Sequence, residues 1–149
     1  GGYLLKPKII KKINHDYYSE EFYQPNILYK NIKKNTSETM LLLLQETVKK
    51  GTAKKAYIKE LAVGGKTGTA EIWSIKDKSY SKDNFFASFA SVFPIDEPKY
   101  VMIISIEAPD YNKRWAAESA VPCAKNIIQD IMFYDSQIIN IKNKINDEA

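Results

Sequence analysis

The chain has 149 residues, of which 44% are hydrophobic and 27% are charged, a composition typical of one ordinary globular domain. Its formal net charge is +4, and it contains one cysteine, Cys123, and one histidine, His15. These counts exclude an internal disulfide, a zinc site built from cysteine and histidine, and a Ser-His-Asp triad with a choice of bases. We expect no metal and no other cofactor, a buried and unreactive Cys123, and no catalytic role for His15.

The basic charge does not indicate a nucleic-acid partner. Arg114 is the only arginine among the 22 basic residues, whereas proteins that read phosphate and guanine favour the bidentate arginine side chain. The longest apolar runs, residues 40–44 and 100–104, are far shorter than the roughly 20 residues that span a bilayer. The chain starts with Gly1 rather than Met and has no signal-peptide pattern, so we expect it to be part of a longer protein.

The first 34 residues carry weak signals of secondary structure. Residues 3–13 mix β-branched residues with lysines and contain Pro7, which favours an edge strand or an extended segment. Residues 15–34 are polar and aromatic and show no sustained period, which predicts a loop with short extended pieces.

A helix is predicted from Asn35 to Gly51. Asn35 and Glu38 resemble a capping box, and glycine is the residue that most often follows a helix end. Apolar residues recur at helical spacing between these two ends. The predicted apolar face consists of Met40, Leu41, Leu44 and Val48.

Three strands are predicted after this helix. Residues 61–73 are apolar and β-branched around a glycine-rich centre, and glycines inside a strand indicate that another group approaches the backbone closely. Residues 84–93 alternate with period two, and residues 100–106 are apolar on both faces, which predicts a central strand paired antiparallel with the one before it. The predicted core face of the second strand comprises Phe85, Phe89 and Phe93.

A final helix is predicted to begin near Ser119, with Pro122 tolerated in its first turn. Its apolar stripe comprises Ala124, Ile127, Ile128 and Ile131. The residues after position 136 are polar with scattered isoleucines, which indicates a tail that forms a loose helix. We therefore divide the chain into a domain portion, residues 1–134, and a polar tail, residues 135–149.

The most informative segment is residues 65–71, with the sequence Gly-Lys-Thr-Gly-Thr-Ala-Glu. It resembles the Lys-Thr-Gly box of the penicillin-binding protein and serine β-lactamase superfamily, which lies on a strand beside an acyl-enzyme serine. The neighbouring Gly51-Thr52-Ala53 and Val63-Gly64 look like the transpeptidase domain of class B penicillin-binding proteins. The stretch 87–101 is similar to the division-specific FtsI type, and the resemblance covers most of residues 1–134.

The resemblance implies a D,D-transpeptidase that cross-links peptidoglycan through a serine acyl-enzyme and needs no cofactor. Lys66 and the hydroxyls of Thr67 or Thr69 offer a cation and hydrogen-bond donors for the terminal carboxylate of a stem peptide. Gly68 lacks a Cβ, so an extended substrate can pair with the strand backbone. For Thr69 the resemblance also implies a catalytic role, with its backbone N–H as one of two oxyanion-hole donors. Glu71 is expected to face solvent.

The family's nucleophile is the serine of a Ser-x-x-Lys box, assisted by a Ser-x-Asn box, and both precede the Lys-Thr-Gly strand. Neither box precedes Lys66 in this chain. The spelling Ser-x-x-Lys occurs at residues 79–82, in a stretch predicted to be a polar loop, and we interpret it as chance. The chain therefore resembles the C-terminal portion of a transpeptidase domain without the acylated serine, and we expect it to be inactive alone.

The predicted fold class is α+β, an antiparallel β-sheet flanked by helices as in β-lactamases and transpeptidases, here an incomplete C-terminal portion with about three strands. The resemblance implies five strands in the whole domain, so the strand at residues 100–106 is expected to expose an apolar edge. Through this edge we expect pairing with the remainder of its own domain and self-association. The other implied partners are peptidoglycan stem peptides, β-lactams and cell-division proteins, at the periplasmic face of the bacterial inner membrane.

Two alternative functions share the motif. A serine β-lactamase, or its sensor-domain relative, would carry an upstream Ser-x-x-Lys and, as an enzyme, release hydrolysed β-lactam quickly. A non-catalytic module would use Lys66 and its neighbours to hold peptide carboxylates without any acylation.

Overall fold

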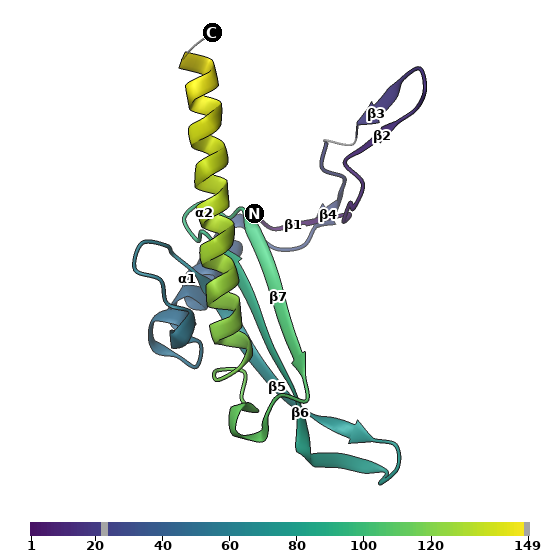
Figure 1. Cartoon of the computed structure of the whole chain (residues 1–149), viewed down its shortest axis with the longest axis vertical. Coiled ribbons are helices and arrows are strands. Elements are labelled where there is room, and N and C mark those ends of the chain that lie inside the picture. Colours follow the sequence, from purple (N-terminus) through teal and green to yellow (C-terminus); the bar gives the residue numbers. More distant parts are fainter. Residues whose placement is uncertain (22–23, 148–149) are drawn as a thin grey trace. The chain divides into compact units, whose positions relative to one another are not determined.

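The computed structural model describes residues 1–21 and 24–147, and for residues 137–147 it describes the backbone alone. The chain forms two compact units, Gly1–Leu41 and Leu42–Ala149. Within the described residues the elements follow one another as four short strands, a helix, three longer strands in one sheet, and a long C-terminal helix (Figure 1).

Two small antiparallel ladders occupy the first unit. β1 (Tyr3–Leu5) pairs with β4 (Ile27–Lys30), and β2 (Lys12–Asn14) pairs with β3 (Ser19–Glu21). The loop predicted over residues 15–34 therefore contains two strands. Strands of three or four residues are too short for a period-two alternation to stand out in the sequence.

His15 lies in the turn between β2 and β3. The backbone N–H of His15 donates a hydrogen bond to the Tyr18 carbonyl at 2.8 Å and closes the turn. The two rings stack, with their centroids 4.2 Å apart. His15 thus has a local role in the turn of a hairpin.

α1 (Lys34–Lys50) begins in the first unit and ends in the second. It starts one residue before the predicted N-cap, so Asn35 lies inside its first turn. Val48 is buried as predicted, but Met40 is exposed. Met40 precedes the stretch of α1 that contacts the start of β5, where Leu44 and Gln45 lie against Gly64. The helix ends at Gly51 as predicted, where the Gly51 N–H donates to the Thr47 carbonyl.

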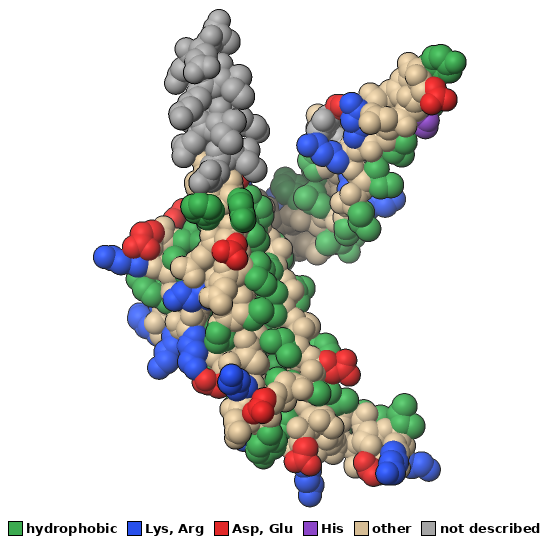
Figure 2. Space-filling view, viewed as in Figure 1, with side chains coloured by type: hydrophobic (Ala, Val, Ile, Leu, Met, Phe, Trp, Pro, Cys, Tyr) green, Lys and Arg blue, Asp and Glu red, His purple; other side chains and the backbone are tan. Residues whose placement is uncertain are grey.

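The second unit contains a three-stranded antiparallel sheet. β5 (Gly64–Ser74), β6 (Ser79–Phe93) and β7 (Tyr100–Glu107) pair in the order β5-β6-β7. The three predicted strands and the α+β class are thereby confirmed. In the space-filling view, hydrophobic side chains form a band over β7 (Figure 2).

One detail of this sheet differs from the prediction. The hairpin of β5 and β6 extends into the stretch predicted as a polar loop, where Ser74 pairs with Ser79, so the Ser-x-x-Lys spelling lies on a strand. Among the described residues β6 is the only ladder partner of β7, so β7 leaves one edge open, as expected for a portion of a larger sheet.

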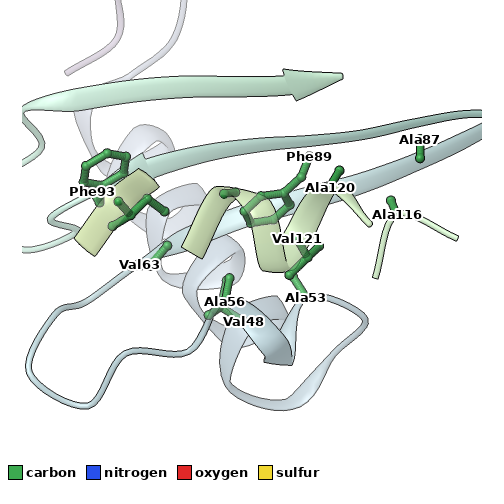
Figure 3. Packing of buried hydrophobic residues seen from close by; sticks show 12 residues of the cluster. Val48, Ala53, Ala56, Val63, Ala87, Phe89, Phe93, Ala116, Ala120 and Val121 are labelled. Carbon is green, nitrogen blue, oxygen red and sulfur yellow. The ribbon is translucent and has the colours of Figure 1, made fainter. Parts of the chain in front are cut away.

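The core lies on one face of β6. Phe89 and Phe93 are fully buried there and Phe85 is nearly so, which confirms the predicted phenylalanine face. Figure 3 shows this face packed together with side chains from α1, the segment after it and the start of the C-terminal helix. A Cβ on Gly65 would approach a ring carbon of Phe89 to 2.5 Å, so the glycine is what lets Phe89 reach the core.

The C-terminal helix α2 (Ala120–Asp147) covers this face. Ala124 and Ile128 are buried and confirm the predicted stripe, and the helical backbone continues into the segment predicted as a loose helix, of which residues 148–149 lie outside the described part. Cys123 was predicted to be buried but is exposed, because it points away from the side of the helix that carries Ala124. Among the described residues, no helix is both long and apolar enough to cross a bilayer.

Candidate functional site

The Lys-Thr-Gly box lies in the middle of β5. Lys66 is paired with Ala90 of β6 and Gly68 with Ser88, so one edge of the strand is used in the sheet. No strand among the described residues pairs with its other edge. Because side chains alternate along a strand, Thr67 and Thr69 share the face of the sheet that carries Phe89, and Lys66 belongs to the opposite face.

The two threonine hydroxyls connect β5 to segments outside the sheet. Thr67 Oγ1 lies 2.8 Å from Thr52 Oγ1, in the loop that follows α1. Thr69 Oγ1 accepts a hydrogen bond from the Ala116 N–H at 3.2 Å, in the segment before α2. Each hydroxyl carries one proton, so the Thr67–Thr52 pair retains one unshared O–H and Thr69 retains its own. The strand is therefore anchored on both sides of Gly68 and still offers two donors.

Lys66 supplies the positive charge of this strand. Its side chain is exposed, and Nζ donates to the Thr67 carbonyl oxygen at 2.8 Å. Within the described part of the chain, no carboxylate lies within 4.0 Å of Nζ. An ammonium group has three N–H donors, so two of them remain for an anionic ligand.

Glycines allow the close packing that places the box. A Cβ on Gly64 would approach the Ile95 side chain to 2.6 Å and the backbone nitrogen of Gln45 in α1 to 3.1 Å. The Gly65 carbonyl accepts a hydrogen bond from the Thr47 hydroxyl of the same helix. These contacts seat α1 directly against the start of β5 and so determine where Lys66 emerges.

The space for a side chain at Gly68 is limited for a different reason. A Cβ at this position would lie 2.7 Å from the Ser88 hydroxyl oxygen on β6. The same hydroxyl donates to the Gly68 carbonyl at 3.4 Å, so Ser88 lies across the missing side chain. The obstacle is the end of a small side chain, which makes Gly68 less constrained by packing than Gly65.

An open groove of about 370 Å³ continues from Thr69 along β5. It is lined by Thr69, Ala70, Glu71, Tyr80, Phe85 and Trp115. The groove was not predicted from the sequence. The register places Glu71 opposite Phe85, which a hairpin alignment could have suggested, but Trp115 arrives from a segment more than forty residues away in the chain.

Comparison with known proteins supplies the family. The family model described as "Penicillin binding protein transpeptidase domain" matches residues 1–129. The chain belongs to this family. The resemblance found in the sequence to a class B, FtsI-type penicillin-binding protein is confirmed by relatives that carry the FtsI name.

The relatives of the transpeptidase family are longer than this chain. The peptidoglycan D,D-transpeptidase FtsI homolog of Chlorokybus atmophyticus is 26% identical over 127 residues, which are 85% of this chain and 18% of that protein. FtsI of Buchnera aphidicola is 33% identical over 141 residues, 93% of this chain and 23% of that protein. The chain thus spans about a fifth of the length of these relatives.

A solved structure of the same family matches the fold. Penicillin-binding protein 3 of Mycobacterium tuberculosis, in complex with ampicillin, aligns with a TM-score of 0.78 and 25% identity. The alignment covers 91% of this chain and 32% of that one. The predicted architecture, a portion of a transpeptidase domain, is therefore confirmed at the level of the fold.

Proposed function

We propose that this chain is part of a peptidoglycan D,D-transpeptidase and forms the wall of the active site that holds the terminal carboxylate of a stem peptide. The observation that carries the proposal is the chemistry of β5, where Lys66, Thr67 and Thr69 keep donors for a ligand beside an unpaired strand edge. A hydrogen bond to a charged group is typically worth about 1.5–3 kcal/mol. Membership of the transpeptidase family and the names of the relatives support the same conclusion.

The proposed reaction is acyl transfer through a serine ester. The serine oxygen attacks the carbonyl carbon of the penultimate D-Ala, the peptide bond to the terminal D-Ala breaks, and an amine of a second stem peptide later displaces the serine. The Thr69 backbone N–H would donate to the oxyanion of the tetrahedral intermediate, and losing one such donor usually costs about 10²–10³ in rate. The anchoring of the Thr69 hydroxyl by the Ala116 N–H would keep this backbone group in place.

The nucleophile is proposed to come from another part of the full-length protein. No Ser-x-x-Lys precedes Lys66, and Ser79 lies at the exposed start of β6 rather than at the start of a helix. The chain alone should therefore not be acylated. The full-length protein would be acylated by β-lactams, as the ampicillin complex of the M. tuberculosis relative suggests for the family.

β7 is proposed to be a protein-binding edge. Val101 and Ile103 are exposed on one face, and the outer backbone of the strand has no ladder partner among the described residues. Such an edge is a template for a further strand. In the full-length protein the remainder of the transpeptidase domain would cover it, and the isolated chain would self-associate there. Cell-division proteins and a position at the periplasmic face of the inner membrane are part of the same proposal.

Intact-mass spectrometry after incubation with a reactive penicillin tests the proposed function. We expect one covalent adduct on the full-length gene product and none on the 149-residue chain. In the full-length protein, Lys66→Met should slow acylation, whereas Ser79→Ala should leave the rate unchanged. An adduct on the short chain that Ser79→Ala removes would contradict the assignment of the nucleophile.

The same experiment separates the alternatives. Rapid loss of the adduct with release of hydrolysed penicillin would indicate a β-lactamase. No adduct on either protein, together with binding of peptides that end in D-Ala-D-Ala, would indicate a non-catalytic binding module.

A further inference from the structure

Two segments outside the sheet contact the Lys-Thr-Gly box from the same side. In the loop that follows α1, the Thr52 hydroxyl lies 2.8 Å from the Thr67 hydroxyl. In the segment before α2, the Ala116 N–H donates to Thr69 Oγ1 at 3.2 Å. Because Thr67 and Thr69 share one face of β5, the two segments reach this face on either side of Gly68. The position of the box therefore depends on both segments.

Lys55 belongs to the first segment and lies three residues after Thr52, in the short helix η1 (Lys54–Ala56). The Ala56 N–H donates to the Ala53 carbonyl at 2.9 Å and closes this turn. Both alanines are fully buried. The backbone of Lys55 is therefore fixed relative to the hydroxyl of Thr52.

Glu118 belongs to the second segment and lies two residues after Ala116. Its N–H donates to the Trp115 carbonyl at 2.8 Å, and the Ala116 carbonyl accepts from the Val121 N–H at 2.9 Å. On the other side of Ala116, the Arg114 guanidinium lies 5.2 Å from the centroid of the Trp115 ring. The backbone of Glu118 is therefore fixed relative to the amide that binds β5.

An ion pair joins the two segments. Lys55 Nζ donates a hydrogen bond to Glu118 Oε2, and the two residues are 63 positions apart in the sequence. The buried residues of the two segments are Ala53, Ala56 and Ala116, which belong to one core (Figure 3). Because alanine side chains bury little apolar area, packing alone holds the segments together weakly. The ion pair adds a directional contact between them.

The exposure of this pair separates its effect on geometry from its effect on stability. The Lys55 and Glu118 side chains are 46% and 43% exposed, and exposed ion pairs contribute little to the free energy of unfolding. An active site is more sensitive, because a displacement of about 1 Å can cost about 10²-fold in rate. A weak contact can therefore be important for the position of a reacting group.

We propose that Lys55 and Glu118 are positioning residues of the active site. Their ion pair holds the loop after α1 and the segment before α2 closed on β5, and so keeps the Thr69 backbone N–H directed at the oxyanion. The inference rests on the proposed function, which gives this N–H its role. It goes further by naming two residues, outside the motif and distant from each other in sequence, on which the rate of acylation depends.

Acylation kinetics of the full-length gene product with a fluorescent penicillin test the inference. Glu118→Gln and Lys55→Met should each lower the first-order acylation constant by about threefold, the size expected for an exposed ion pair. The penicillin concentration at half-saturation should not change, because the oxyanion forms only after binding. The double variant that exchanges the charges, Lys55→Glu with Glu118→Lys, should recover most of the rate.

A second ion pair provides the matched control. Lys50 Nζ lies 2.8 Å from Glu46 Oε2 on α1, and both side chains are exposed. Glu46→Gln breaks this pair without touching either segment at the box. We expect Glu46→Gln and Glu118→Gln to have similar thermal midpoints, and Glu46→Gln to keep the acylation constant of the unmodified protein.

Salt distinguishes a charge effect from a packing effect. In about 1 M NaCl the Debye length is roughly 3 Å, so exposed ion pairs are screened. The ratio of the acylation constants of the unmodified protein and Glu118→Gln should therefore fall towards one. Screening of Lys66 affects both proteins equally and cancels in this ratio.

The outcomes distinguish this inference from the one on which it rests. Equal acylation constants for the unmodified protein, Lys55→Met and Glu118→Gln overturn the positioning role and leave the proposed function standing. It is also overturned if the charge exchange recovers no rate, if the ratio is the same at high salt, or if Glu46→Gln is equally slow. An unmodified full-length protein that is not acylated rejects the proposed function and the positioning role together.

Discussion

β5 and β7 occupy equivalent positions as the two outer strands of one sheet, yet their sequences are opposite in character. β5 has three glycines and two threonines in its first six residues, whereas residues 101–106 of β7 are isoleucine, valine and methionine interrupted by one serine. Both have one edge without a ladder partner among the described residues. The position in the sheet therefore does not explain the difference.

The contacts of the two strands do explain it. β5 admits neighbours that come close to its backbone: α1 at Gly64, the Phe89 ring at Gly65, and hydroxyl or amide groups at both threonines. β7 packs one row of side chains on the core and leaves the other row exposed. A strand whose backbone is contacted closely by other groups needs small and polar residues. A strand whose side chains only pack against a core needs branched apolar residues.

The largest expected effect on stability is in β5, whose backbone is in close contact with its neighbours. Gly65→Ala places a methyl group within 2.6 Å of both the Phe89 ring and the Ala90 carbonyl oxygen, and a backbone atom cannot move aside easily. Overpacking of this kind typically lowers the free energy of unfolding by about 1–3 kcal/mol, and urea titration followed by circular dichroism measures it. Ser105→Ala, on the exposed row of β7, should change it by less than about 0.5 kcal/mol. Equal midpoints for both variants would show that the two strands are equally tolerant.

The two rows of β7 provide the next comparison. Ile104 packs on the core and is partly buried, whereas Ile103 is 67% exposed. Ile104→Ala should cost about 1–2 kcal/mol, below the roughly 2–5 kcal/mol of a fully buried site, and Ile103→Ala less than about 1 kcal/mol. The measurement is the same urea titration at low protein concentration. Similar costs for the two variants would mean that the outer row is covered in solution.

The proposed pairing through the β7 edge gives a third prediction. Ile103→Lys places a charge on the exposed row, and charged residues on outer strands discourage edge-to-edge association. We expect the unmodified chain to show a mass by light scattering that rises with concentration and the variant to remain close to 17.1 kDa. Leu43→Lys, which adds the same charge at an exposed position of α1, serves as the control and should not change association. A monodisperse monomer of the unmodified chain would contradict the pairing.

The smallest expected effect concerns the residue before β7. Lys99 Nζ lies 2.8 Å from an Asp135 carboxylate oxygen of α2, and this hydrogen bond raises the pKa of Lys99 above its usual 10.5. Because the folded pKa is the higher one, the stabilisation is complete below pH 10.5 and is lost as the pH rises through the folded value. Thermal unfolding of the unmodified chain and of Lys99→Gln should therefore converge in alkaline solution. A difference between them that persists above that range would assign the effect to packing.

The sequence alone predicts the parts of this fold that depend on local patterns. The period-two spacing of Phe85, Phe89 and Phe93 identified the buried face of β6, and Gly51 marked the end of α1. The open edge of β7 did not follow from its apolar pattern, because hydrophobicity on both faces of a strand does not count its neighbours; it was expected only from the resemblance, which implies strands outside this chain. In the first unit, β1 and the start of β2 lie in the segment predicted as an edge strand or extended, whereas β3 and β4 were expected only as short extended pieces of a loop, because they are too short to show a period.

The candidate site likewise has features that the sequence predicts and features that it does not. The spacing of Lys66, Thr67 and Thr69 and their location on one strand follow from the sequence. The contacts of the threonine hydroxyls with Thr52 and the Ala116 amide do not, since they depend on how two distant segments close around β5. The groove at Glu71 needs both kinds of information, a hairpin register and the tertiary position of Trp115.

The order of the three strands has a consequence for folding kinetics. β5, β6 and β7 follow one another in the chain and pair in that same order, so every ladder of the sheet joins sequence neighbours. Contacts of short sequence separation form quickly, since little loop entropy is lost in closing them. During synthesis this meander can form as soon as residue 107 has emerged, before the helix that covers its phenylalanine face exists. For that interval the bare apolar face and the open edge of β7 are exposed together, which makes the newly made sheet a natural target for chaperones that hold unfinished chains apart.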